Sequence, residues 1–216
     1  MTETPYSISV RLNALMAESG LDPLSPVLGK QFEEYHSLLI RWNARVNLTA
    51  IRDGEGILSR HFVESIACAR ALPAGITTLL DYGSGAGFPG IPIALCRPEI
   101  SVTLAESNGK KAAFLHEAVR ILGISAAIHS LRAELLFTGF DCVALRAVDR
   151  MEEAVRSASR LVASKGWLAL MSTSPEVEAL RAAAGPKFTW GASIRLPGSE
   201  GRILALGAEC EGPSSN

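Results

Sequence analysis

The stretch Asp81-Tyr82-Gly83-Ser84-Gly85-Ala86-Gly87-Phe88-Pro89-Gly90 decides the fold of this 216-residue chain. It follows an apolar run, residues 76–80, and leads into a second one, residues 91–95. This order predicts a strand, a glycine turn and a helix. Glycines are needed where a chain reverses at the end of a strand and where a ligand lies against bare backbone. We therefore predict a ligand-binding turn at this point in an α/β protein.

The glycines of this turn can be aligned in two ways. Gly85-x-Gly87-x-x-Gly90 fits the dinucleotide-binding fingerprint. Asp81-x-Gly83-x-Gly85-x-Gly87 fits the acidic, glycine-alternating loop of enzymes that bind S-adenosylmethionine (SAM). The second alignment accounts for more residues, including the carboxylate that ends the strand, and we prefer it.

A second acidic residue supports a cofactor at this turn. Glu106 ends the β-branched, apolar run 101–105 and lies 23 residues after Gly83. A carboxylate about 20 residues beyond the first glycine is the usual partner of ribose hydroxyls. A strand, a glycine loop, a helix and a second strand ending in Glu together predict a bound nucleoside.

The composition excludes several classes of protein. With 48% hydrophobic and 20% charged residues, the chain has the balance of a globular domain, and it contains no apolar run of the ~20 residues that a membrane helix needs. The N-terminus lacks the features of a signal peptide. The four cysteines are widely spaced, which predicts buried thiols in a reducing compartment and no metal site. The net charge of −1 argues against bulk attraction to nucleic acid. We expect a monomeric cytoplasmic protein.

The chain divides into a helical first part, residues 1–73, an α/β domain, residues 74–210, and a tail, residues 211–216, predicted to be disordered. In the first part, Ser7 and Ser25-Pro26 are the expected helix starts, and apolar spacing predicts helices over 8–18, 26–46 and 53–71. The second part alternates. Strands are predicted at 77–81, 101–105, 125–129, 141–145 and 166–172, helices at 89–96, 109–122, 149–163 and 175–184, and an antiparallel hairpin at 187–208.

Alternation of strands and helices predicts a mostly parallel sheet covered on both faces. In such sheets, ligands bind beyond the carboxyl ends of the strands. Asp81, Glu106, the segment Arg132-Ala133-Glu134 and Arg146 all follow predicted strands. We therefore expect these residues to share one edge of the sheet.

Several segments together resemble a known family. They are Trp42-Asn43-Ala44-Arg45-Val46-Asn47-Leu48-Thr49, Arg60-His61-Phe62-Val63-Glu64-Ser65, the glycine loop, Glu106-Ser107 with Lys110-Lys111, Arg132-Ala133-Glu134, and 140–147. In this order they resemble the bacterial 16S ribosomal RNA guanine-N7 methyltransferases of the RsmG (GidB) type, over roughly residues 32–170. The resemblance implies a class I SAM-dependent methyltransferase, with a Rossmann-like sheet and an N-terminal helical extension. It implies SAM as cofactor and 16S ribosomal RNA or the 30S particle as partner.

The resemblance also implies roles for individual residues. Cofactor-binding residues would be Asp81, Gly83, Gly85, Gly87, Phe88, Glu106, Ala133, Glu134 and Arg146. Catalytic residues would be Arg146 and Arg132, and substrate-binding residues would be Arg60, His61, Asn47 and Lys110. Asp81 is expected to order the loop or to meet the amino group of the methionine moiety. The chain departs from the family at Ser172-Thr173, where Lys-Gly is usual, and at Glu64, where Asp is expected and where we predict that the carboxylate orders Arg60 or His61.

Absent motifs bear on the chemistry. The sequence has no Pro-Cys pair for methylation at pyrimidine carbon, and no Asn/Asp-Pro-Pro-aromatic loop for amino-group methylation. Guanine N7 carries no proton and needs alignment more than a general base. Two alternatives remain: an NAD-dependent oxidoreductase, although Tyr6, Tyr35 and Tyr82 form no Tyr-x-x-x-Lys pair, and a non-catalytic RNA-binding or ribosome-assembly factor.

Overall fold

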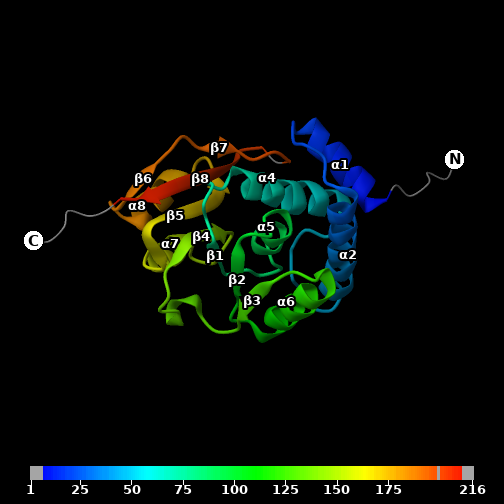
Figure 1. Cartoon of the computed structure of the whole chain (residues 1–216), viewed down its shortest axis with the longest axis horizontal. Helices are drawn as coiled ribbons and strands as arrows, with labels where there is room; N and C mark the ends of the chain where they lie inside the picture. The colour runs from blue at the N-terminus through cyan, green and yellow to red at the C-terminus, as the bar shows by residue number, and fades with distance from the viewer. Residues whose placement is uncertain (1–6, 199, 211–216) are drawn as a thin grey trace, which may run out of the picture.

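One mixed sheet organises the chain in the computed structural model, which describes residues 7–198 and 200–210. The strand order in this described part is β3-β2-β1-β4-β5-β8-β6, with β7 paired to β8 (Figure 1). The parallel strands are β1 (Thr78–Tyr82), β2 (Ser101–Ala105), β3 (Ala126–His129), β4 (Phe140–Arg146) and β5 (Val162–Thr173). β8 (Arg202–Glu209) runs antiparallel to β5, and β6 (Phe188–Trp190) and β7 (Ile194–Arg195) run antiparallel to β8. The predicted fold class is confirmed.

Side-chain alternation along the strands separates two apolar layers. Leu79, Cys142 and Ala144 pack with α5 (Gly90–Cys96) and α6 (Gly109–Leu122), while Leu80, Val143 and Leu145 pack with α7 (Met151–Ser159) and α8 (Val177–Ala184). Successive residues of a strand point to opposite faces, so a sheet buried on both sides needs apolar residues at nearly every position. This requirement explains the adjacent apolar residues Leu79 and Leu80 of β1 and the apolar run 142–145 of β4.

The N-terminal helices extend the first of these layers. α1 (Ile8–Glu18) and α2 (Pro26–Asn43) are followed by one helical segment made of α3 (Gly54–Gly56), a π-helical stretch (Ile57–Val63) and α4 (Glu64–Ala71). Their buried side chains join the same apolar cluster as α5 and α6. Figure 1 shows α2 and α4 beside α5 and α6. The helical extension therefore packs on the sheet domain as part of its core.

The structure corrects several expectations from sequence. The side chain of Ser7 bonds to Glu33 and does not cap α1, whereas Ser25 caps α2 as predicted. Asp53, the predicted start of the third helix, caps α3. The second helix ends at Asn43, not at 46, because the Asn43 side chain accepts the amides of Leu48 and Thr49 and forms a turn there. The helix predicted at 149–163 is the shorter α7, because β5 already begins at Val162.

Two further expectations concern exposure and the tail. Cys210 is exposed at the end of β8, whereas Cys68 and Cys142 are buried as expected. Residues 211–216, the predicted disordered tail, lie outside the described residues. Within residues 7–198 and 200–210, no helix is both long and apolar enough to cross a membrane.

Candidate functional site

A cleft of about 690 Å³ runs along the carboxyl ends of the parallel strands. The glycine loop after β1, Glu106 after β2, the turn Arg132–Glu134 after β3 and Arg146 at the end of β4 line it. The segment 48–51, with Arg60 and His61 of the π-helical stretch, lines it from the N-terminal extension. The edge of the sheet that was predicted to collect these side chains is therefore a hollow built from both parts of the chain.

The glycine loop presents bare backbone to this cleft. Gly83 and Gly85 have φ angles of +73° and +57°, a region that side chains other than glycine rarely adopt. A Cβ atom at Gly85 would meet nothing closer than the carbonyl oxygen of Gly83, at 3.9 Å. A Cβ atom at Gly83 would lie 3.0 Å from Val148, another residue of the cleft wall. Gly85 therefore leaves open space where a ligand can approach the main chain.

Asp81 and Gly87 lie behind this surface and do not line the cleft, although both were predicted to bind the cofactor. A Cβ atom at Gly87 would come within 2.9 Å of the Tyr35 hydroxyl, so this glycine is required by packing. Asp81 is 1% exposed, and its Oδ2 accepts the amide of Gly90 at 3.1 Å. Burial raises the pKa of Asp81 to about 7. The bond to Gly90 joins the end of β1 to the start of α5. It agrees with one of the two roles expected for Asp81, that of ordering the glycine loop.

Glu106 holds the loop from the neighbouring strand. Its Oε2 accepts the amide of Gly85 at 2.9 Å, and its Oε1 accepts the amide of Asn108 at 2.7 Å. The carboxylate therefore faces the open side of the glycine loop, and it also lines the cleft. Carboxylate oxygens have lone pairs for further donors, so Glu106 suits the pair of ribose hydroxyls predicted for it.

His61 forms part of an aromatic wall at the other side of the loop. Its ring stacks on Phe88 with centroids 4.6 Å apart, and its Nε2 lies 2.7 Å from the Thr49 hydroxyl. Burial, followed by the nearby Arg146, lowers the pKa of His61 to about 3, so the ring is neutral near pH 7. Phe88 also packs on Tyr35, whose hydroxyl donates to the carbonyl of Ala86. These contacts fix the far end of the glycine loop to α2.

A buried ion pair connects the sheet to the N-terminal extension. Arg146 Nη2 lies 3.0 Å from Glu64 Oε2, and the two side chains are 7% and 1% exposed. Arg202 Nε of β8 lies 3.7 Å from the same oxygen. Burial lowers the pKa of Arg146 to about 10, which leaves the guanidinium charged near pH 7. The carboxylate of Glu64 thus contacts Arg146 and Arg202, and its predicted role in ordering Arg60 or His61 stays a prediction.

The π-helical stretch explains how Arg146 is held. Its guanidinium donates to the Arg60 carbonyl and, over 3.3 Å, to the Ser65 hydroxyl. π-helical turns misalign backbone carbonyls with the regular helical ladder and are common at functional sites. The Arg146 guanidinium also lies 5.9 Å from the centre of the Phe88 ring. The end of β4, the helical extension and the glycine loop therefore meet at this one side chain.

The other predicted site residues divide into two groups. Arg132, Ala133, Glu134 and Arg60 line the cleft, whereas Asn47 and Lys110 do not. Asn47 accepts a hydrogen bond from Arg52, and the lysine that lines the cleft is the adjacent Lys111. Sequence reasoning missed further lining residues: Thr49, Tyr82, Val148, Arg150 and Arg202. Of these, Thr49 and Tyr82 lie within segments that the sequence had singled out, whereas Val148, Arg150 and Arg202 do not.

Near the end of β5, this chain has Ser172-Thr173 where the resembled family usually has Lys-Gly. Ser172 and Thr173 donate to Glu176 Oε2 over 3.0 and 2.7 Å, and Thr173 lies opposite Arg202 in the antiparallel register. A cation is therefore supplied at this strand end from β8. Among the described residues, no group of three or more His, Cys, Asp or Glu could hold a metal ion.

The features of the cleft fit a nucleoside cofactor with an amino-acid end. Gly83 and Gly85 leave main chain uncovered, Glu106 offers a carboxylate to hydroxyl groups, and the turn at Ala133 offers a small buried side chain at the β3 end. The volume lies within the ~300–1,000 Å³ usual for cofactor sites.

Comparison with known proteins identifies relatives of this chain. A family model described as rRNA small subunit methyltransferase G (GidB) matches residues 29–204. The Ribosomal RNA small subunit methyltransferase G of Stenotrophomonas maltophilia (strain K279a) is 39% identical over 202 residues, which cover 91% of this chain and 92% of that protein. The protein of the same name from Roseiflexus sp. (strain RS-1) is 37% identical and covers 82% of this chain and 81% of its own length.

Solved structures resemble this one in fold. A SAM-dependent methyltransferase from Aquifex aeolicus superposes with a TM-score of 0.57 at 14% identity, over 72% of this chain and 93% of that chain. M. jannaschii TYW2, solved in complex with AdoMet, superposes with a TM-score of 0.55 at 13% identity, over 74% of this chain and 77% of that chain. At these identities the likeness establishes the fold alone.

Proposed function

The chain belongs to the rRNA small subunit methyltransferase G (GidB) family, and on this premise we propose how its cleft transfers a methyl group from SAM to N7 of a guanine in 16S ribosomal RNA. The chain is a SAM-dependent methyltransferase by family and by fold. The oxidoreductase and non-catalytic alternatives are not favoured by relatives that all carry methyltransferase names.

One observation favours N7 over a pyrimidine carbon: the described residues of the cleft include the carboxylates of Glu106, Glu134 and Asp149 but no cysteine that could add to a pyrimidine ring. The buried thiol of Cys68 does not line the cleft, and burial raises its pKa to about 12, so it stays protonated near pH 7. Burial, followed by the nearby Arg146, lowers the pKa of His61 to about 3, so its ring is neutral near pH 7, and the ring already contacts Thr49 and Phe88. Such a cleft suits an acceptor that is already nucleophilic, and guanine N7 has a lone pair and no proton to remove.

Different residues of the cleft would bind different parts of the cofactor. Gly83 and Gly85 would accommodate the methionine end against bare main chain, Glu106 would accept from the ribose hydroxyls, and Ala133 with Glu134 would meet the adenine. When bound, SAM supplies an electrophilic methyl group on a sulfonium. The apolar wall of Phe88 and Val148 would exclude water from the reacting atoms.

The two predicted catalytic arginines lie at different ends of this arrangement. Arg132 follows β3 and Arg146 ends β4, three strands away in the sheet order. Neighbouring strands are ~4.8 Å apart, so these strand ends are separated by about 14 Å. We therefore assign Arg146 to the side of the acceptor, where it holds Arg60 and Phe88 in place, and Arg132 to the adenosine end.

Cations around the rim support an RNA substrate. Arg60, Lys111, Arg132 and Arg150 line the cleft and belong to partly or fully exposed positions. Arginine and lysine neutralise phosphates, and such contacts position RNA without reading its sequence. This local charge is compatible with a chain whose net charge is −1. We further propose that the protein acts as a monomer in the cytoplasm, where ribosomal RNA is made.

The proposal is tested by mapping N7-methylguanine in 16S RNA from a strain that lacks this gene. One guanine should lose its methyl group, and the purified protein with SAM should restore it on free 16S RNA or on 30S particles from that strain. Unchanged N7 methylation throughout the 16S RNA of the deletion strain would refute the proposal.

A further inference from the structure

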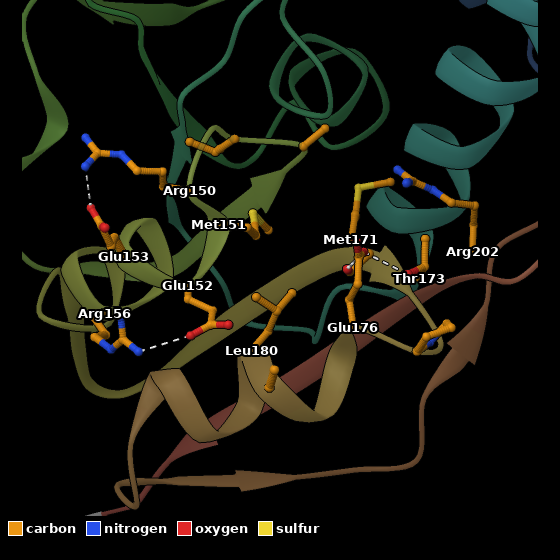
Figure 2. Close-up of a pocket in the computed structure, with 15 residues that line it drawn as sticks. Arg150, Met151, Glu152, Glu153, Arg156, Met171, Thr173, Glu176, Leu180 and Arg202 are labelled. Carbon is orange, nitrogen blue, oxygen red and sulfur yellow. Dashed lines mark hydrogen bonds and ion pairs between the residues drawn. The ribbon is translucent and has the colours of Figure 1, made fainter.

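A second cavity, of about 820 Å³, lies beside the cleft and is shown in Figure 2. It is lined by the loop after β4, the end of β5, α7 and the first turn of α8, together with Arg202 of β8. Four residues line both spaces: Ala147, Val148, Arg150 and Arg202. Ala147 and Arg150 have φ angles of +51° and +49°, which side chains rarely adopt. The strained loop between β4 and α7 is therefore the partition between the two cavities.

The order of the strands places this cavity on the acceptor side of the cofactor. In the proposed function the adenine lies at the end of β3, the ribose at β2 and the methionine at β1. Continuing along the same edge, the next strand ends are those of β4 and β5, where the second cavity lies. A group that attacks the methyl carbon must approach from the side opposite the rest of the cofactor. The cavity thus occupies the position that an incoming base requires.

The walls of the cavity suit a flat heterocycle. Met151, Met171 and Leu180 contribute apolar surface from α7, β5 and α8 (Figure 2). Methionine sulfur makes favourable contacts with aromatic rings. The volume exceeds what a purine needs and leaves room for its sugar and phosphate.

One carboxylate of this cavity, that of Glu176, is placed to accept hydrogen bonds from a pair of uncharged N–H donors. Glu152 and Glu153 are paired with Arg156 and Arg150, each at 3.1 Å. Glu176 instead accepts hydrogen bonds from two hydroxyl groups, those of Thr173 and Ser172, both at Oε2. These two bonds hold the pKa of Glu176 below its usual value. Glu176 is therefore an oriented, ionised carboxylate in the described cavity, and it does not line the cofactor cleft.

From this arrangement we infer that the second cavity receives the target guanosine of the RNA and that Glu176 reads its N1–H and N2–H₂ donors. The inference rests on the proposed function and adds a substrate site to it. Guanine presents N7 on one edge and these two donors on the opposite edge, so turning N7 toward the cofactor turns the donors into the cavity. Adenine offers no such donor pair, so a carboxylate here selects guanine.

Arg202 completes the site at the partition. Its Nε lies 3.7 Å from Glu64 Oε2, and its backbone lies opposite Thr173 of β5, whose hydroxyl donates to Glu176. A guanidinium at the boundary of both cavities is placed to donate to guanine O6 while N7 remains unbonded. Arg202 is thus a positioning group for the base rather than a residue of the cofactor site.

The first test fills the cavity. Ala179 lines it on α8, and Ala182 is an exposed alanine one turn further along the same helix that does not. Ala179→Phe should lower methyl transfer to 16S RNA or 30S particles at least tenfold and leave SAM affinity by calorimetry unchanged, and Ala182→Phe should change neither. Circular dichroism establishes that each variant is folded.

The second test addresses the carboxylate and remains informative if Ala179→Phe does not fold. Glu176→Gln keeps an oxygen for Ser172 and Thr173 but removes the charge. Glu178→Gln, on the same helix and outside the cavity, is the matched control. Loss of a hydrogen bond to a charged group should lower kcat/KM about 10- to 100-fold in Glu176→Gln. The parent protein should also discriminate by a similar factor against RNA with inosine, which lacks the N2 amino group, at the methylated position, and Glu176→Gln should lose most of this discrimination.

The outcomes separate the two proposals. If the parent protein methylates no guanine N7 in 16S RNA, the proposed function fails. If the parent methylates it and both cavity variants match their controls, or if the parent treats inosine and guanosine alike, the inference about the cavity is overturned. A loss of SAM affinity in Glu176→Gln would also overturn it, because the cavity would then belong to the cofactor.

Discussion

Arg146→Met should destabilise the protein strongly, because it leaves the carboxylate of Glu64 buried without its nearest cation. Removing one partner of a buried ion pair costs about 3–5 kcal/mol. The Arg146 and Glu64 side chains are 7% and 1% exposed, so solvent cannot replace the lost contact. Arg202 stays 3.7 Å from Glu64 and retains part of the attraction. We therefore expect about 3 kcal/mol, at the lower end of that range.

The loss is measured by urea denaturation and by thermal melting. For a chain of this length, 1 kcal/mol corresponds to about 2–4 °C, so Tm should fall by roughly 6–12 °C. Replacing both partners, as Glu64→Leu with Arg146→Met, should recover most of the stability, because neither member of the pair is then left buried without the other. Methyl transfer should stay low in both, since neither holds Arg60 and Phe88 as Arg146 does.

A loss below about 1 kcal/mol in Arg146→Met would refute this reasoning, as would a double variant less stable than either single one. The resemblance found in the sequence implied only a cofactor-binding and catalytic role for Arg146. The buried partner at Glu64 changes that expectation, because the same side chain now serves both the fold and the site.

Four further outcomes are expected. Gly85→Val should abolish SAM binding measured by calorimetry, while Gly75→Val, at another open glycine with positive φ, should strain the backbone similarly and leave SAM affinity intact; equal effects would show that strain alone is responsible. Glu106→Ala should weaken SAM binding by about 1–3 kcal/mol, and an affinity equal to the parent's would mean that the carboxylate only orders its loop. Arg60→Ala should raise the apparent KM for RNA and lower the slope of log K against log salt by about one, which an exposed arginine without phosphate contact would not do. The pKa of His61 is lowered to about 3, so its neutral form stabilises the folded state above pH 6.5 and this contribution is lost as pH falls from 6.5 toward 3; His61→Gln should flatten that part of the stability profile, and an NMR titration with a midpoint near 6.5 in the folded protein would contradict it.

The sequence by itself determined the elements and the cofactor loop. Ser25-Pro26 and Asp53 were recognised as helix starts because capping depends on a few neighbouring residues. The strand 101–105 and the helix 109–122 have the predicted bounds, since apolar runs and spacing report directly which residues are buried. Gly83 and Gly85 adopt the positive φ angles that their pattern indicated. Glu106 contacts that loop, and the contact with ribose hydroxyls that its spacing suggested stays a prediction.

Only the tertiary structure decided which distant side chains meet. Arg146 and Glu64 are 82 positions apart, and their contact depends on how the helical extension packs on the sheet. Arg202 reaches the site because the antiparallel register of β5 and β8 sets it opposite Thr173. The π-helical stretch leaves the Arg60 carbonyl for Arg146, which helical periodicity alone does not indicate. Local sequence patterns report backbone preference and burial. These contacts depend instead on strand register and on packing between segments that are distant in the chain. The proposed substrate side of the site is built from such contacts.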